Sequence, residues 1–212
     1  HQKQLYAEQL IVEFPTAIEE RQFQIYFQPK FSVVPEVPVL ASAEALVRWV
    51  HPKLGMISPG DFIPLFEDNG LVQTLDHYVW EETARQIAAW RDRCGVTLPV
   101  SVNLSRVDVF DQNLMETLDG IIARHELQAG DLKLEVTESA YTENAEQLIQ
   151  VIEELRAKGY KIEMDDFGSG YSSLNMLKNM PIDIIKIDMV FLRTAGQDAK
   201  SMLILRNIIN MA

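Results

Sequence analysis

The sequence predicts an α/β domain with a largely parallel sheet that curves into a barrel. Three observations predict this fold. Short β-type runs alternate with amphipathic helical stretches, each run has one apolar and one polar face, and each is followed by a helix that can cover the apolar face. The polar faces then point away from the helices, towards the barrel interior. Function in such barrels lies at the C-terminal ends of the strands.

The elements follow in a regular order. Residues 1–20 are expected to form a lead-in helix or linker from a preceding domain, and residues 21–212 the domain itself. Strands are expected at 23–28, 41–49, 99–104, 131–138, 160–166 and 182–188. Apolar side chains at helical spacing predict one helix around Leu75–Ile87 and another around Ala145–Leu155, which Lys158 and Gly159 end.

Composition excludes several classes of protein. The 212 residues are 47% hydrophobic and 24% charged, as in an ordinary globular chain, and the net charge is −12. Such a surface repels phosphate, so no nucleic acid polymer is expected as a partner, and an anionic substrate needs metal ions or local cations. Cys94 is the only cysteine, which excludes an internal disulfide. No apolar run is long enough to span a bilayer, so we expect a cytoplasmic segment without membrane contact, even where its parent protein is membrane-anchored.

A set of polar residues is expected at the strand ends and has the composition of a metal site. Its members offer only hard oxygen ligands beside one lysine: Glu44, Asn103, Glu135, Asp165, Asp166 and Lys186. Oxygen ligands suit Mg²⁺, Mn²⁺ or Ca²⁺ rather than zinc or copper. For any single acid, an ion pair with a lysine or a helix cap is the simpler interpretation. For the whole set at neighbouring strand ends, the metal interpretation is favoured.

The segment Asp165-Asp166-Phe167-Gly168-Ser169-Gly170 is the most informative one. Adjacent strand residues face opposite sides, so both aspartates can serve one site only where the strand ends. Two adjacent acids can bridge a pair of metal ions, as in phosphodiester hydrolysis. Lys186 on the next strand would orient the attacking water or stabilise charge on the phosphate. A buried ion pair between Lys186 and an aspartate is compatible with either role.

Six motifs occur in order: AEALVRWVHP, ISPGDFIP, SVNLS, LEVTES, DDFGSGYSSL and IKID. With them, the chain from about Phe23 onward resembles the EAL domain family, cyclic di-GMP phosphodiesterases on a (β/α)₈ TIM-like barrel whose first strand is antiparallel to the rest. The resemblance implies a hydrolase of bacterial second-messenger signalling. Metal-activated water would open cyclic di-GMP to linear pGpG.

The resemblance also assigns roles to individual residues. It implies a two-metal site for Mg²⁺ or Mn²⁺, in which Glu44, Asn103, Glu135 and Asp165 hold the first ion and Asp165 with Asp166 the second. Lys186 would help to position the water. Gln28, Leu46 and Arg48 would bind the dinucleotide. Glu138 would steady the loop after the two aspartates, Phe167 to Ser173, through which a homodimer is expected.

The family pattern continues beyond Ala212, the last residue of the chain. It adds a seventh strand, with a glutamate of the second metal site, and an eighth, whereas Ala212 falls in the helix after the sixth. We therefore expect about six of eight barrel strands in this chain, a parent protein that continues, and an adjoining GGDEF or sensor domain.

The sequence is also compatible with two other functions. A catalytically inactive EAL receptor for cyclic di-GMP usually lacks the metal acids or the glycine-rich loop, both of which are present in this chain. An unrelated metalloenzyme on the same barrel would require six ordered motifs to arise by coincidence. The enzyme is favoured over both.

Overall fold

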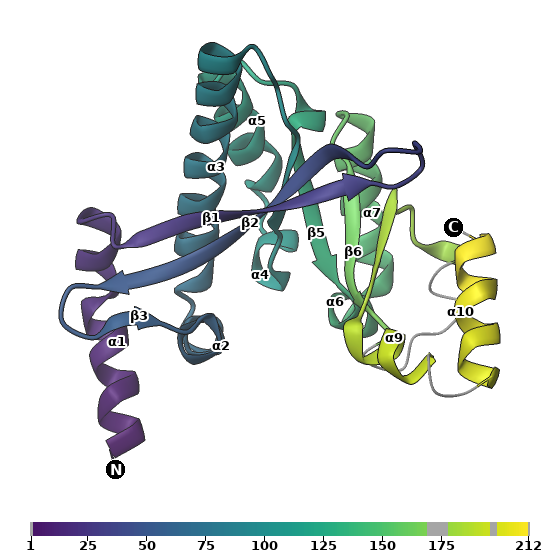
Figure 1. The fold of residues 1–212 in the computed structure, drawn as a ribbon. Helices are drawn as coiled ribbons and strands as arrows, with labels where there is room; N and C mark the ends of the chain where they lie inside the picture. Colours follow the sequence, from purple (N-terminus) through teal and green to yellow (C-terminus); the bar gives the residue numbers. More distant parts are fainter. Residues whose placement is uncertain (1, 169–177, 196–198, 212) are drawn as a thin grey trace. The chain divides into compact units, whose positions relative to one another are not determined.

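The computed structural model describes residues 2–168, 178–195 and 199–211, and Figure 1 shows their helices and strands. They form two compact units, His1–Leu132 and Lys133–Ala212. Each unit combines strands with helices, as the alternating pattern of the sequence predicts.

The first unit contains an antiparallel hairpin joined to a parallel strand. Its strands are β1 (Phe23–Ser32), β2 (Val39–His51), β3 (Gly55–Ile57) and β4 (Val100–Asn103). Strands β1 and β3 pair antiparallel with β2, whereas β4 pairs parallel with it. The expected antiparallel first strand is therefore confirmed. The helices of this unit are α1 (Gln2–Glu19), α2 (Pro59–Asp68), α3 (Val72–Cys94), α4 (Arg106–Val109) and α5 (Leu114–Arg124), followed by a 3₁₀ turn at Ala129–Asp131.

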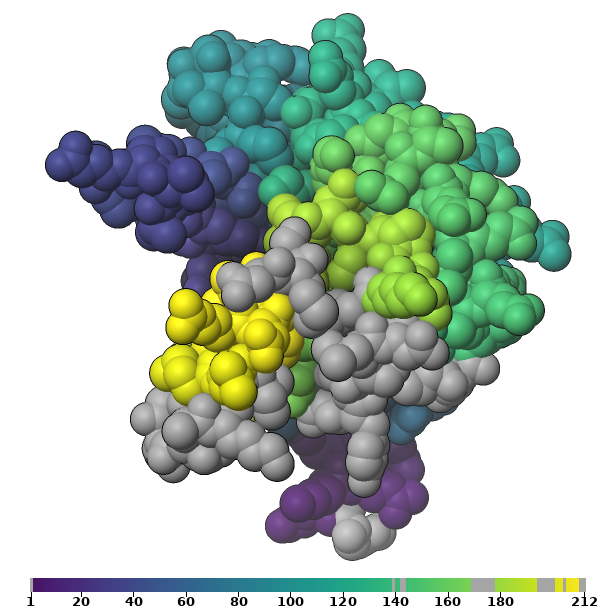
Figure 2. All heavy atoms as spheres, turned by 90° about the vertical axis from the view of Figure 1, so that its right-hand side faces the viewer, coloured from purple at the N-terminus to yellow at the C-terminus, as the bar shows by residue number. Residues whose placement is uncertain are grey.

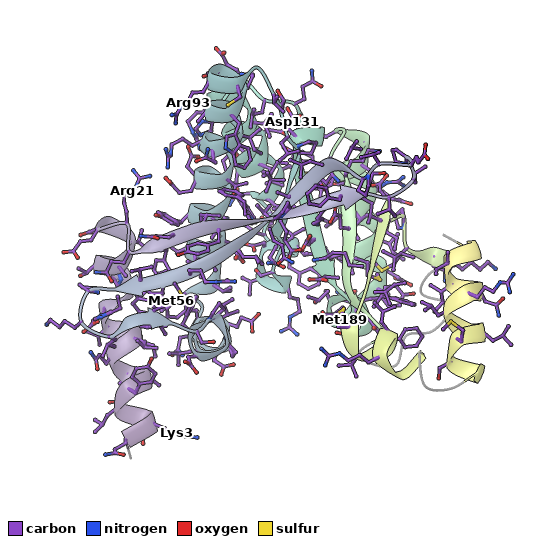
Figure 3. All side chains as sticks on the ribbon, in the orientation of Figure 1. Lys3, Arg21, Met56, Arg93, Asp131 and Met189 are labelled. Atoms are coloured by element: carbon purple, nitrogen blue, oxygen red, sulfur yellow. The ribbon has the colours of Figure 1, made fainter. Side chains whose placement is uncertain are left out.

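The long helix α3 covers the apolar face of the strands in the first unit. Leu75, Val79 and Ile87, all in the expected apolar stripe, are buried. Gly95 ends the helix in the left-handed conformation, and its N–H donates to the carbonyl of Arg91 at 2.8 Å. Arg93 projects from this last turn (Figure 3), where a cation interacts favourably with the helix dipole.

Helix α1 contributes to the hydrophobic core of the first unit. Leu10, Phe14 and Ala17 are buried on one of its faces. The Phe14 ring lies 4.7 Å from that of Phe66 in α2, and Phe23 at the start of β1 lies 4.9 Å from Trp49 in β2. These aromatic contacts join α1, α2 and the hairpin in one cluster.

A polar contact also fixes α1 to the end of β2. His51 is buried, and its Nδ1 accepts hydrogen bonds from the backbone N–H groups of Lys53 and Leu54 at 3.1 and 3.0 Å. Its Nε2 is then the protonated nitrogen and donates to the carboxylate of Glu13. This hydrogen bond holds the pKa of Glu13 below its ordinary value.

The hairpin is longer than the sequence predicts. Its strands reach Ser32 and begin at Val39, beyond the expected ranges 23–28 and 41–49. Pro29 is tolerated in β1 because, among the described strands, β1 pairs only with β2. The apolar tip stands out from its unit in Figure 2, and Val34 is 94% exposed.

The second unit is built from parallel strands joined by helices. β5 (Leu132–Thr137), β6 (Ile162–Phe167) and β7 (Ile184–Ile187) pair parallel in that order. Its helices are α6 (Glu138–Glu143), α7 (Ala145–Ala157), α9 (Met189–Ala195) and α10 (Ala199–Met211). Leu148, Ile152 and Leu155 form the buried face of α7, as the helical spacing predicts. None of the described helices is both long and apolar enough for a bilayer span.

Candidate functional site

Most of the predicted metal-site residues lie within two residues of the C-terminal ends of their strands, and Glu44 is the exception. Asn103 is the last residue of β4, as expected. Glu44, however, is in the interior of β2, opposite Ser101 of β4, because β2 continues to pair with β1 and β3 as far as His51. Glu135 and Asp165 lie two residues before the ends of β5 and β6, and Lys186 lies one residue before the end of β7. The strand-end expectation is therefore wrong for Glu44, where pairing with β1 and β3 extends β2 to His51.

An acid–lysine cluster, consisting of Glu135, Asp165 and Lys186, joins the three strands of the second unit. Lys186 Nζ lies 2.8 Å from Glu135 Oε2 and 3.1 Å from Asp165 Oδ1. The Glu135 side chain is fully buried, whereas 23% of the surface of each of the other two side chains is exposed. Two carboxylates thus share one ammonium group in a partly desolvated place, where a cation is held by charge and by hydrogen bonds.

A neighbouring ion pair has an ordinary structural role. Glu163 of β6 lies directly opposite Glu135 of β5 and is also buried. Lys133 Nζ is 3.2 Å from Glu163 Oε1. Without their lysines, these two facing carboxylates would repel each other. Each acid therefore has its own lysine, and the contact that Lys186 makes with Asp165 is additional to this neutralisation.

The two adjacent aspartates are arranged by a bulge in β6. Asp166 has a φ of +56°, and the pairing with β7 shifts register between Met164 and Phe167. The N–H of Asp166 donates to Asp165 Oδ1 at 2.9 Å. A bulge interrupts the strict alternation of side chains. The sequence predicted that both aspartates could serve one site only where the strand ends. The bulge permits this arrangement before the end of β6.

Glu138 contacts the segment that follows the aspartates. It is buried at the start of α6, and its Oε2 accepts a hydrogen bond from the Gly168 N–H at 3.3 Å. Gly168 has a φ of +96°, and a Cβ added there would lie 3.0 Å from Cγ of Phe191. The remainder of the expected loop, residues 169–173, lies outside the described residues, as does the dimer contact that was expected there.

Replacing Gly168 with alanine is expected to destabilise the protein by about 2 kcal/mol, because a left-handed backbone and a close contact act together. Gly55→Ala is the matched control, since Gly55 also has a positive φ but nothing lies within 4 Å of its added Cβ. It should cost about 1 kcal/mol. Urea unfolding measures both, and equal losses would contradict the contact with Phe191.

The first unit places the predicted substrate residues on one face of the hairpin. Glu44, Leu46 and Arg48 alternate along β2, and their direct partners in β1 are Gln28, Tyr26 and Gln24. The Arg48 guanidinium lies 5.8 Å from the centre of the Tyr26 ring, a cation–π contact. Tyr26 was not among the residues predicted from the sequence. Tyr26 precedes Gln28 by two residues, so strand alternation places both on the same face and could have indicated a role for Tyr26.

A second residue that the sequence analysis missed is Lys30. Its Nζ is 2.8 Å from Ser101 Oγ and 3.9 Å from Glu44 Oε2. It therefore brings a cation to Glu44 within the first unit. Period-two alternation from Gln28 would place Lys30 on the same face, but the cross-strand register was needed to connect it with Glu44.

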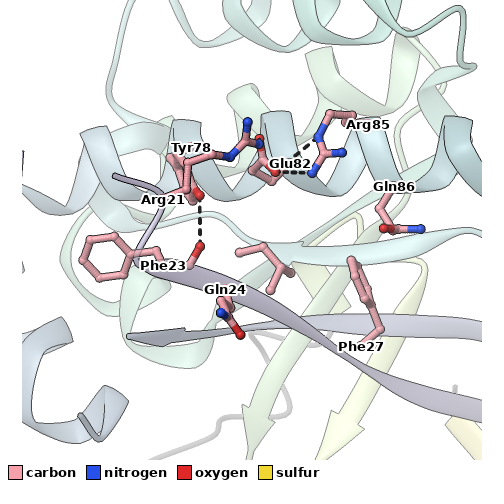
Figure 4. A pocket seen from close by; sticks show the side chains of 9 residues that line it. Arg21, Phe23, Gln24, Phe27, Tyr78, Glu82, Arg85 and Gln86 are labelled. Carbon is pink, nitrogen blue, oxygen red and sulfur yellow. Dashed lines mark hydrogen bonds and ion pairs between the residues drawn. The ribbon is translucent and has the colours of Figure 1, made fainter. Parts of the chain in front are cut away.

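The first unit also has a cleft between β1 and α3 (Figure 4). Its volume is about 220 Å³, and Tyr78 donates a hydrogen bond to the Phe23 carbonyl across it at 2.9 Å. Arg21 and Arg85 both pair with Glu82 at its rim. None of the predicted site residues lines this cleft.

The fold and the acid–lysine cluster define an α/β domain of the TIM-like type with clustered carboxylates on its strands. Residues 11–212 match the EAL domain family, and the chain belongs to this family. It is 37% identical over 95% of its length to the bifunctional diguanylate cyclase/cyclic di-GMP phosphodiesterase MucR of Pseudomonas aeruginosa. It is 39% identical over 92% of its length to the cyclic di-GMP phosphodiesterase PdeR of Escherichia coli. The chain spans about 29% of the length of each of these two relatives.

Solved structures agree with this assignment. The phosphodiesterase PaMucR in complex with c-di-GMP has a TM-score of 0.85 and 36% identity, and the match covers 95% of this chain and 81% of that one. The EAL enzyme Bd1971, bound to cAMP and cyclic di-GMP, has a TM-score of 0.87 and 27% identity, with 98% and 57% covered. The expected EAL fold class is therefore confirmed.

Proposed function

We propose that this chain is the metal-dependent phosphodiesterase part of a longer cytoplasmic signalling protein and hydrolyses cyclic di-GMP to linear pGpG. The observation that carries the proposal is the contact of Lys186 with both Glu135 and Asp165, in a member of a family whose relatives include named cyclic di-GMP phosphodiesterases.

The proposed cofactor is a pair of Mg²⁺ or Mn²⁺ ions. The proposed ligands are all hard oxygen donors: Glu44, Asn103, Glu135 and Asp165 for the first ion and Asp165 with Asp166 for the second. The fit is supported by the way Glu135 and Asp165 already hold a cationic group between them. When bound, such ions activate water and stabilise negative charge on a phosphodiester.

The residues of this chain would bind the dinucleotide and orient the attack. Gln28, Leu46 and Arg48 are proposed to bind it, with Tyr26 packed against Arg48. A guanidinium group held over an aromatic ring is suited to both a phosphate and a base. The Lys186 ammonium, a positive group between two acids, would hydrogen-bond to the attacking water or to a phosphate oxygen. Glu138 would hold the backbone that follows the aspartates through Gly168.

Two partners belong to the same proposal. A homodimer through the loop after Asp166 is expected from the resemblance alone. An adjoining GGDEF or sensor domain is supported by the greater length of the relatives, of which MucR is named bifunctional. Sedimentation of the protein with and without cyclic di-GMP tests the dimer.

The test of the activity is hydrolysis of cyclic di-GMP with Mg²⁺ or Mn²⁺ and then with EDTA, followed by chromatography. Formation of pGpG that EDTA abolishes is expected. Binding of cyclic di-GMP without any product would favour the receptor, and product that resists EDTA would contradict the role of the metal.

A further inference from the structure

A partly buried polar cluster lies beside the turn that follows β4. It consists of Asp76 and His77 from α3 with Ser105 and Asp108 from the start of α4, and Asp108 is fully buried. Oδ2 of Asp76 and Oδ1 of Asp108 find no hydrogen-bond donor among the described residues. Buried acceptors without a donor are costly, so this cluster requires an explanation.

Ser105 and Asp108 form a capping box that shapes the turn. The Asp108 N–H donates to Ser105 Oγ at 3.3 Å, and the Ser105 N–H donates to Asp108 Oδ2 at 3.1 Å. Since α4 is only four residues long, this reciprocal cap accounts for much of its local order. The cap begins two residues after Asn103.

Asp76 approaches this cap from α3. Burial raises the pKa of Asp76 well above its ordinary value, and the adjacent Asp108 carboxyl raises it further. The charge of Glu67 in α2 acts in the same direction, while a hydrogen bond from Ser105 opposes it. A raised pKa favours the protonated form of Asp76, which can then donate to Asp108, whose Oδ1 otherwise has only His77 Nε2 nearby at 3.8 Å.

Trp80 holds the other end of the same segment. Its Nε1–H donates to the carbonyl of Asn103 at 2.9 Å, and its side chain is fully buried. The Trp80 ring packs against His77 at 4.9 Å between ring centres, and His77 Nε2 lies 3.8 Å from Asp108 Oδ1. Three residues of adjacent turns of α3 therefore contact the segment 103–108 at both ends.

Asn103 lies beyond the part of β4 that pairs with β2. The pairing of β2 with β4 ends at Ser101, and the Asn103 residue is exposed at the end of β4. An amide ligand binds a metal well only when its carbonyl oxygen is held in the required direction. The hydrogen bond from Trp80 restrains the backbone of Asn103 and thereby restricts the direction in which the Asn103 side chain points.

We propose that Trp80, together with the carboxyl pair Asp76–Asp108, is a positioning element that holds Asn103 ready to ligate the metal. The inference rests on the proposed function, in which Asn103 is a ligand. It adds residues of α3 that touch neither substrate nor ion and act through a backbone carbonyl and a helix cap.

The test compares two tryptophans in the protein. Trp80→Phe removes the donor to Asn103, and Trp49→Phe is the matched control, because Trp49 is also fully buried and its Nε1 donates to Gln22 Oε1 at 3.0 Å. The dissociation constant for Mn²⁺ alone is measured by calorimetry. Loss of such indirect support typically weakens metal binding 10- to 100-fold, so Trp80→Phe should weaken Mn²⁺ binding by about tenfold, whereas Trp49→Phe leaves it unchanged.

The outcomes separate this inference from the proposed function. Failure of the wild-type protein to bind Mn²⁺ overturns the metal proposal itself. Normal binding by both wild type and Trp80→Phe overturns only the positioning role. If Trp80→Phe does not fold, Ser105→Ala serves instead, since it removes the capping hydroxyl and leaves Trp80 in place. Weaker Mn²⁺ binding supports the inference, and unchanged binding contradicts it.

The raised pKa of Asp76 predicts a pH-dependent stability. Because the pKa of Asp76 is raised in the folded state, its favourable contribution is complete below the ordinary value of 3.8 and is lost as the pH rises through the raised pKa. Asp76→Asn keeps a donor towards Asp108 without this titration. Its melting temperature should exceed that of the wild type at pH 7–8, and the difference should vanish at low pH. A difference that does not change with pH would contradict the raised pKa of Asp76.

Discussion

Replacing Asp165 with asparagine is expected to abolish hydrolysis and leave the fold intact. Asp165 receives the N–H of Asp166 and lies 3.1 Å from Lys186, and asparagine keeps the shape of the side chain and one acceptor oxygen. It lacks the negative charge that a divalent ion requires. Loss of several kcal/mol of transition-state stabilisation lowers the rate by about a thousandfold or more. Product formation from cyclic di-GMP measures this loss.

The matched control is the same substitution at Asp183, in the same unit. Asp183 also pairs with two cations, Arg156 and Lys161, and accepts the N–H of Ile162 at 3.0 Å. Asp183→Asn should lower the stability of the fold. It should leave the rate within about twofold, because Asp183 is not one of the proposed metal or substrate ligands. Unchanged hydrolysis by Asp165→Asn would refute its assignment as a metal ligand.

Replacing Lys186 with methionine is expected to remove most of the rate and to retain binding of the dinucleotide. The fully buried Glu135 would also lose the ammonium 2.8 Å away. Because breaking one partner of a buried pair is costly, the metal-free variant should be less stable by about 2 kcal/mol, a value reduced for the partial exposure of Lys186. Added Mg²⁺ should restore part of this stability. Urea unfolding and calorimetry with cyclic di-GMP give both quantities.

Lys133→Met provides the comparison for Lys186, because Lys133 pairs with the neighbouring Glu163. Lys133→Met should lower the stability of the protein. Its rate of hydrolysis should equal that of the wild type when the metal sites are equally filled. If Lys186→Met instead loses binding and keeps its rate, Lys186 is a substrate clamp and has no role in orienting water.

The arrangement of elements could be predicted from sequence because it depends on local periodicity. The apolar stripe Leu148, Ile152 and Leu155 determines the buried face of α7, and short alternating runs mark the strands. The strand β3 and the extension of the hairpin to Val39 could not be found in this way. Their residues become strands only because β2 offers a pairing edge, which is a property of the tertiary structure.

The chemistry of the site could be predicted better than its geometry. Acids and a lysine at similar places on successive strands indicated the cluster of Glu135, Asp165 and Lys186. The position of Glu44 inside β2 and the bulge at Asp166 depend on the pairing register, which no local pattern contains. Trp80 lies within the expected helix Leu75–Ile87, and apolar helical spacing gives no indication that its Nε1 reaches the carbonyl of Asn103.

The junction of α1 with β2 has a mechanical consequence. Phe14 is embedded among aromatic rings, and Glu13 binds the imidazole at the far end of the strand, so α1 is fixed to β2 at two points. A rotation of α1 exposes Phe14 and breaks the bond to His51 unless β2 turns with it. β2 also bears Glu44, Leu46 and Arg48 at alternate positions. A displacement of α1 is therefore expected to change the position of the strand that carries these three side chains.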